Sequence, residues 1–186
     1  MRDQDFNSVN ASVGWRYAKP AVLLHWALAV LIASLLGIGW YMMAIENDPG
    51  SGWYFDIHKS FGLVVFGLVL LRILWRSTHR PAPLPAGLPK WQVGLSQLTQ
   101  GALYLCMVLM PILGFLGASF SKSGIAFFGT SLPVWTVPNH DTAELFFGLH
   151  SALAWVLVAL IALHAVGGLK HLLIDKDGVF QRMWLR

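Results

Sequence analysis

The sequence has few charged residues and a single cysteine. Charged side chains make up 12% of the 186 residues and hydrophobic ones 56%, whereas soluble domains usually carry roughly 25% and 45–50%. So little charge cannot cover a water-facing surface, which excludes a disordered chain and most soluble enzymes. The lone Cys106 excludes an internal disulfide, and no CxxCH motif for covalent haem attachment is present. We therefore expect an integral membrane protein of the all-α class.

The sequence also lacks a run of basic residues and a recognisable signal peptide. The formal net charge is +4, but lysine and arginine form no run, so we expect no nucleic-acid partner. Residues 1–19 are polar and mixed in charge, with no apolar core and no small-residue cleavage site. We expect no removable signal peptide, and the first apolar segment itself would direct insertion into the membrane.

Four apolar segments are long enough to cross a membrane, because a hydrocarbon core of about 30 Å needs about 20 helical residues. They cover about residues 20–44, 54–75, 95–120 and 145–173. Pro20 suits a helix start, and Pro111 predicts a kink within the third segment. The sequence predicts a four-helix bundle in which residues 1–186 form one domain.

The two longer connections differ in character. A proline-rich connector, RPAPLPAGLP at 80–89, cannot be helical throughout. The stretch SKSGIAFFGTSLPVWTVPNHDTAE at 121–144 carries glycine, proline and aromatic residues. We expect it to lie along the membrane surface with its aromatic rings at the level of the lipid headgroups.

Basic residues gather at one end of the predicted bundle. Eleven of the 13 precede the first segment, lie around the second connection or follow the fourth segment: Arg2, Arg16, Lys19, Arg72, Arg76, Arg80, Lys90, Lys170, Lys176, Arg182 and Arg186. The other end has Lys59 and Lys122 with five acidic residues: Glu46, Asp48, Asp56, Asp141 and Glu144. By the positive-inside rule, both termini are expected to be cytoplasmic.

Five of the seven histidines fall inside the predicted crossings, where ionisable side chains are rare and usually functional. His171 lies at the cytoplasmic end of the fourth segment, and the other four are the candidates for a buried site. His25 and His164 lie about 7.5 and 9 Å from the cytoplasmic ends of the first and fourth segments, at 1.5 Å per residue. His58 opens the second segment at the outer end, and His150 lies six residues beyond Glu144 in the fourth. The four histidines therefore form two groups of similar depth.

The spacing along the fourth segment pairs these histidines. His150 and His164 are fourteen residues apart, which brings them within about 40° of one helix face and about 21 Å apart along the axis. His25 then faces His164, and His58 faces His150. Zinc usually takes three or four protein ligands, whereas two axial imidazoles suit a porphyrin that supplies four more nitrogens. We expect non-covalent haem at both pairs; polar contacts between helices are the alternative.

Other residues near these pairs are weaker indications of a haem site. Five glycines would let a macrocycle approach the backbone, or would simply allow close helix packing: Gly62, Gly67, Gly148, Gly167 and Gly168. Lys59 and Arg72 are candidates to pair with haem propionates, unless they extend to the membrane interface. His171 is interpreted as an interfacial or quinone-side residue, and His79 and His140 as solvated loop residues.

These residues resemble the bacterial cytochrome b561 family of four-helix, di-haem b proteins of the inner membrane. The resemblance covers nearly the whole chain: HW at 25–26, HKSFG at 58–62, RILWR at 72–76, HSALAWVLVALIALH at 150–164 and KHLLIDKDGVFQRM at 170–183. It implies two non-covalent haems b on the same histidine pairs and electron exchange with quinone. At least one member is a superoxide oxidase that reduces ubiquinone. Some members carry a histidine early in the third helix, where this chain has none.

Three functional hypotheses follow. The first is an electron carrier between the quinone pool and a donor, either superoxide or a periplasmic redox partner; with superoxide it would be a superoxide:ubiquinone oxidoreductase. The second is a cytochrome b subunit that anchors a dehydrogenase or hydrogenase. The third is a haem-free transporter or scaffold, although transporters usually show inverted repeats and more crossings.

The sites of donor and quinone are left open by the sequence. The acidic outer end does not steer superoxide globally, so only local guidance by Lys59 and Lys122 would favour that donor. Quinone has two candidate locations: the outer segment with Trp135, and the cytoplasmic rim near Arg16 and His171.

Overall fold

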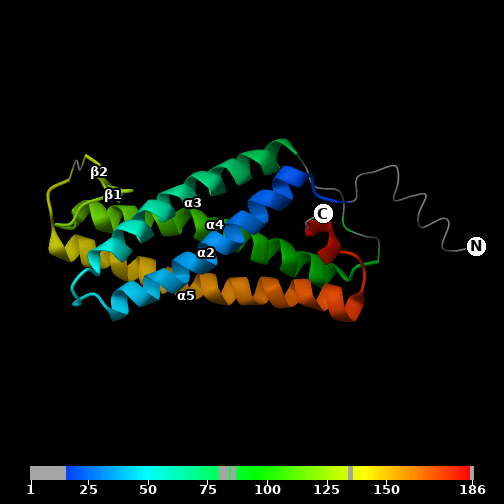
Figure 1. Ribbon diagram of the computed structural model, residues 1–186. Helices are drawn as coiled ribbons and strands as arrows, with labels where there is room; N and C mark the ends of the chain where they lie inside the picture. Colours follow the sequence, from blue (N-terminus) through cyan, green and yellow to red (C-terminus); the bar gives the residue numbers. More distant parts are fainter. Residues whose placement is uncertain (1–15, 80–83, 85–86, 134–135, 185–186) are drawn as a thin grey trace, which may run out of the picture.

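The computed structural model describes residues 16–79, 84, 87–133 and 136–184. Four long helices run side by side along one axis (Figure 1): α2 (Lys19–Ala44), α3 (Gly52–Thr78), α4 (Lys90–Phe120) and α5 (His140–Lys170). All four are long and apolar enough to cross a membrane. The predicted all-α membrane bundle is confirmed.

The helices extend beyond the apolar segments. α4 begins at Lys90 rather than near 95, α5 begins at His140 rather than near 145, and α3 is longer at both ends. The prediction that His140 lies in a loop was wrong, because it is the first residue of α5. Asn139 explains this start, since its side chain accepts a hydrogen bond from a backbone amide three residues on. Hydropathy marks the part of a helix inside the membrane, whereas caps decide where the helix begins.

A short hairpin caps one end of the bundle. Strands β1 (Ala126–Phe127) and β2 (Thr130–Ser131) pair antiparallel through a two-residue turn. Both turn residues have positive φ, +45° at Phe128 and +82° at Gly129, as expected for a tight hairpin turn. The Phe128 amide donates to the buried Ser60 Oγ of α3 at 2.8 Å. The strands were not predicted, because a phenylalanine rarely adopts positive φ.

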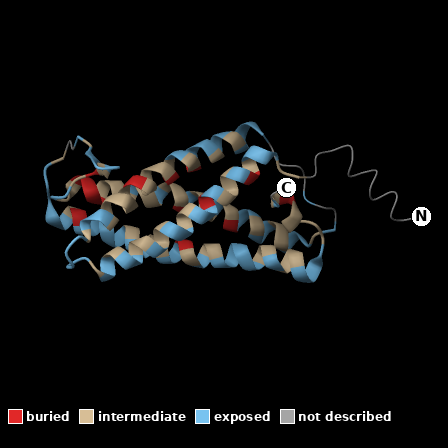
Figure 2. Ribbon diagram, in the orientation of Figure 1, coloured by how far each residue is buried: buried red, intermediate tan, exposed pale blue. Residues whose placement is uncertain are grey.

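The helices pack as neighbours in the order of the chain. α2 packs on α3, α3 on α4, and α4 most extensively on α5, while α2 and α5 do not pack closely within the described residues. A small core of Leu28, Val65 and Val69 lies between the first three helices. Buried residues are few and scattered along the interior, and most of the outside is exposed (Figure 2). Such an apolar exterior is what a lipid environment requires.

The tail folds back onto the end of the bundle opposite the hairpin. After α5 come a π-helical turn η1 (His171–Asp175) and a 3₁₀ turn η2 (Phe180–Met183). Trp26 Nε1 donates to the Met183 carbonyl at 2.7 Å, and the buried Arg182 guanidinium lies 5.2 Å from the Tyr17 ring centre. Residue 16 and the tail therefore lie at one end of the bundle (Figure 1), as an even number of crossings requires.

We call the end with the tail the inner end and the end with the hairpin the outer end. Some residues used in the sequence predictions lie outside the described residues: Arg2, Arg80, Arg186 and Trp135. The basic residues that are described still gather at the inner end, which is the predicted cytoplasmic side.

Candidate functional site

The inner end brings two histidines from the first and last helices together. The rings of His25 on α2 and His164 on α5 face each other with their centres 6.0 Å apart and their planes at 74°. His25 is half-buried and His164 is exposed. This is the pair that the depths of the two residues predicted.

The outer end repeats this arrangement with a second pair. His58 on α3 and His150 on α5 have ring centres 6.1 Å apart and planes at 75°, and both are half-buried. α5 therefore contributes one imidazole to each pair. The two pairs have nearly the same geometry although they lie at opposite ends of the bundle.

Both spacings suit one metal ion held between two imidazoles. A metal–imidazole nitrogen distance of about 2.0–2.1 Å, with about 1.1 Å from ring nitrogen to ring centre, gives centres about 6.3 Å apart. The observed 6.0 and 6.1 Å are close to this value. Direct hydrogen bonding between the rings would bring their centres closer. The residues therefore fit a group that places a metal between each pair.

The outer rings differ in their hydrogen bonds. His150 Nδ1 lies 2.9 Å from the Met110 carbonyl of α4, which fixes the tautomer and leaves Nε2 free to bind a metal. His58 faces the Leu35 carbonyl of α2, but its buried Nδ1 completes no hydrogen bond. A polar atom left unpaired in this way is common beside a metal or cofactor site.

Two glycines that the sequence analysis missed support the outer rings. A Cβ on Gly39 would lie 3.2 Å from His58 Cε1, and one on Gly114 would lie 3.1 Å from His150 Nδ1. Each glycine follows the facing carbonyl, of Leu35 or Met110, by four residues. Each ring thus lies against backbone that carries no side chain. In the sequence, the only sign of this contact was a glycine within an apolar helix.

Four of the predicted glycines border open space. A Cβ on Gly62, Gly67, Gly148 or Gly167 would meet no atom within 4 Å, while Gly168 lies against Phe180 of the tail. Gly62 and Gly167 follow His58 and His164 by about one turn, so they lie on the same helix faces as those histidines. Space beside the histidines on these faces fits a flat group.

The two predicted cations have different surroundings. Arg72 donates from Nη1 to the Ala21 carbonyl at 2.7 Å and from Nε to the Tyr104 hydroxyl at 3.1 Å. Among the described residues it has no carboxylate partner. Lys59 instead forms an ion pair with Asp56 at 3.0 Å and donates to the Gly124 carbonyl, which lies just before the hairpin. Arg72 therefore lies beside the inner pair with its charge uncompensated, whereas Lys59 is neutralised.

The remaining histidines lie apart from both pairs. His79 follows α3 directly, as predicted, and its ring stacks on Trp75 with centres 3.9 Å apart. His171 Nδ1 lies 2.7 Å from Asp177 Oδ2 and 3.4 Å from Asp175 Oδ2, and a lysine at the end of α5 also pairs with Asp175. His171 therefore belongs to the polar contacts that hold the tail.

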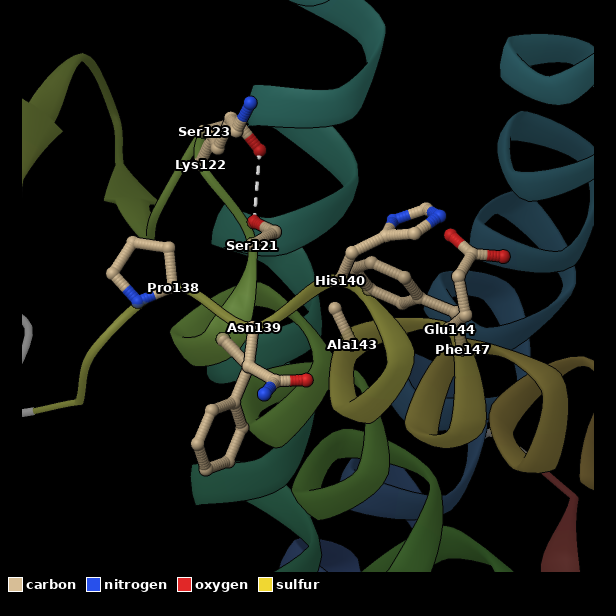
Figure 3. A pocket seen from close by; sticks show the side chains of 10 residues that line it. Ser121, Lys122, Ser123, Pro138, Asn139, His140, Ala143, Glu144 and Phe147 are labelled. Atoms are coloured by element: carbon tan, nitrogen blue, oxygen red, sulfur yellow. Dashed lines mark hydrogen bonds between the residues drawn. The ribbon is translucent and has the colours of Figure 1, made fainter.

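A cavity of about 440 Å³ opens at the outer end, where α4 ends and α5 begins. In Figure 3 the His140 ring and the Glu144 carboxylate lie next to each other at its edge, and Phe147 lies behind them. Lys122 lies on the opposite wall. Phe147 comes one turn before His150, so this cavity adjoins the outer pair without including its rings.

Comparison with known proteins extends these observations. The family described as prokaryotic cytochrome b561 matches residues 16–186. Cytochrome b561 homolog 2 of Escherichia coli K12 is 30% identical over 173 residues, which cover 90% of each chain. Cytochrome b561 homolog 1 of the same organism is 26% identical over 178 residues, 92% of this chain and 98% of that protein. The probable superoxide oxidase CybB of Yersinia pestis is 27% identical over 171 residues, 90% of this chain and 95% of that protein.

The match extends over all four membrane-type helices and both histidine pairs, and it confirms the resemblance seen in the sequence. The chain belongs to the prokaryotic cytochrome b561 family.

Proposed function

We propose that this chain is a di-haem b electron carrier of the bacterial inner membrane that connects a donor at its outer end with the quinone pool. Its family consists of membrane electron-transfer proteins, and the family's cofactor is haem b. The observation that carries the two-haem proposal is the matching spacing of the two imidazole pairs, 6.0 and 6.1 Å. Residues 1–186 would act as one unit.

We assign His25 and His164 as ligands of the inner haem and His58 and His150 as ligands of the outer one. Haem b, if held by these pairs, would supply the chemistry of a one-electron carrier. The chain orients the ligands: α5 separates its two by fourteen residues, or about 21 Å along the axis. The apolar helices around each pair exclude water.

The inner end offers features that suit a quinone head group. A small cavity of about 20 Å³ beside Arg72, with aromatic walls from Trp75 and Tyr104, has room for a quinone carbonyl oxygen, while the ring would lie at its mouth. The Tyr104 hydroxyl and the Arg72 guanidinium provide hydrogen-bond donors there. A lipid-soluble quinone would reach this cavity from the membrane, and it would take protons from the cytoplasmic side.

Superoxide is one candidate donor, supported by the relative named a probable superoxide oxidase. The charges of the outer end do not favour it. The ion pair with Asp56 neutralises Lys59, so Lys122 at the rim of the outer cavity is the cation left to guide an anion. A periplasmic redox protein needs no such guidance.

The decisive experiment counts haems in the purified protein by pyridine haemochrome and a reduced-minus-oxidised visible spectrum. We expect two low-spin haems b per chain, and one after either His25→Ala or His58→Ala. His79→Ala is the matched control, because this exposed histidine lies outside both pairs, and it should retain two. One haem in the wild type, or two in either ligand variant, would contradict the assignment.

A second assay identifies the donor. Superoxide-driven reduction of a ubiquinone analogue is compared between the wild type and the double variant Lys59→Glu, Lys122→Glu. If superoxide is guided locally, the rate falls and its salt dependence changes. An unchanged rate and salt dependence would rule out local guidance.

A further inference from the structure

We propose that this chain holds its two haem sites at different reduction potentials, with the inner site (His25–His164) the higher. Two features set this order: the Arg72 guanidinium beside the inner pair, and the Met110 carbonyl bonded to His150 in the outer pair. The inference rests on the proposed function and adds a driving force for the flow of electrons that it describes. Electrons would run downhill from the outer end to the inner end.

Arg72 is an uncompensated charge next to the inner pair. Its Nη1 binds the Ala21 carbonyl at 2.7 Å, and Ala21 precedes His25 by four residues, one helical turn. The guanidinium is therefore held about one turn of α2 from His25. Among the described residues no carboxylate pairs with it. A fixed positive charge stabilises the reduced, less positive form of a nearby metal centre, so it raises the reduction potential there.

The charges at the two ends act in the same direction. The described part of the inner end carries eight basic and two acidic side chains: Arg16, Lys19, Arg72, Arg76, Lys90, Lys170, Lys176 and Arg182, with Asp175 and Asp177. The outer end carries two basic and five acidic side chains: Lys59 and Lys122, with Glu46, Asp48, Asp56, Asp141 and Glu144. The inner site therefore lies in the more positive field.

The Met110 carbonyl acts on the outer site. It accepts a hydrogen bond from His150 Nδ1 at 2.9 Å, which increases electron density on the ring and makes it a stronger donor to a metal. A stronger donor stabilises the oxidised metal and lowers its reduction potential. Within the described residues, neither His25 nor His164 has a ring hydrogen bond to the protein. The bond at the outer site and the charge at the inner site thus favour the same order.

The first test removes the inner charge. Arg72→Gln is compared with wild type by redox titration of the visible haem bands, fitted with two components. At an effective dielectric constant of about 20, a unit charge within about 12 Å changes an equilibrium constant by about tenfold or more. We expect the reduction constant of the higher component to fall about tenfold, which is 59 mV for one electron, and the lower component to move much less. Arg76→Gln is the matched control, since this exposed arginine one turn away is screened by solvent.

The second test perturbs the outer site through its two glycines. Gly114→Ala forces the His150 ring away and weakens its hydrogen bond to the Met110 carbonyl. The reduction constant of the lower-potential component should therefore rise several-fold. Gly39→Ala crowds the His58 ring to a similar extent, but no hydrogen bond is lost there. It should therefore shift the lower component much less.

The outcomes separate this proposal from the proposed function. Fewer than two haems in the wild type would contradict the proposed function. With two haems present, the order proposed here is overturned if Gly114→Ala shifts the higher-potential component. It is also overturned if Arg72→Gln shifts the lower-potential component most. If Arg72→Gln does not fold, the Gly114→Ala and Gly39→Ala titrations still decide which component belongs to the outer site.

Discussion

Gly117 of α4 tests how closely α4 must pack against α5, the helix that carries His150 of the outer pair. A Cβ at this position would lie 2.6 Å from both Cδ1 and Cε1 of Phe147 and 3.2 Å from Cγ. Real Cβ contacts do not occur at 2.6 Å, and the approach to Cγ means that the ring cannot slip aside without moving its whole side chain. Gly117→Ala therefore forces α4 and α5 apart or turns Phe147 into another rotamer.

The expected cost is about 1–3 kcal/mol, the usual range for one extra carbon in a well-packed contact. Gly101→Ala, on the same helix, is the matched control because a Cβ there meets no atom within 4 Å. Both variants gain the same helix propensity, about 0.5–1 kcal/mol. The difference in stability between them therefore isolates the clash.

The assay is unfolding of both variants in one detergent, followed by far-ultraviolet circular dichroism and by the haem absorption bands. We expect Gly117→Ala to unfold at lower temperature than Gly101→Ala. It should also broaden the signal of the haem proposed at the outer pair, since Phe147 lies one turn before His150. Equal stability of the two variants would show that α4 and α5 are not in this contact, and the reasoning would fail.

Three smaller predictions concern contacts at the two ends of the bundle. Ser60→Ala removes the acceptor that binds the turn of the hairpin, and at about 1 kcal/mol per hydrogen bond it should speed amide hydrogen exchange in residues 126–131 but not in α4. Trp26→Phe removes the bond to the Met183 carbonyl and should make the tail more sensitive to carboxypeptidase, with Trp40→Phe as the control that leaves it unchanged. Asp56→Asn breaks the ion pair with Lys59; because that pair is partly exposed, the stability should change by less than about 1 kcal/mol, and a larger loss would contradict this estimate.

Much of the fold could be predicted from hydropathy alone. Four apolar runs of sufficient length gave the four crossings, and matching depths brought His25 to His164 and His58 to His150. These inferences worked because a helix has a fixed rise and a membrane has a fixed thickness. The ligand roles of these histidines stay predictions.

The other features of the fold and the site depend on contacts that hydrophobic periodicity in the sequence does not reveal. The helix start at His140 depends on the Asn139 cap, and the hairpin depends on a positive φ at Phe128. The ion pair between Lys59 and its neighbour Asp56 was not predicted, and the role of Lys59 at a propionate stays a prediction. The glycine beside His150 belongs to another helix, 36 residues earlier in the chain, so only the folded structure places it there.

One consequence of α5 concerns how the protein is assembled. This single helix contributes one imidazole to each pair, so its rotation and its height in the membrane set the spacing of both pairs at once. If two haems bind as proposed, the first would fix α5 in both respects, and the second pair would need little further ordering. The entropic cost of arranging the helix would be incurred only once, which would make haem insertion positively cooperative. Partly loaded chains should therefore be scarce during maturation compared with empty and fully loaded ones.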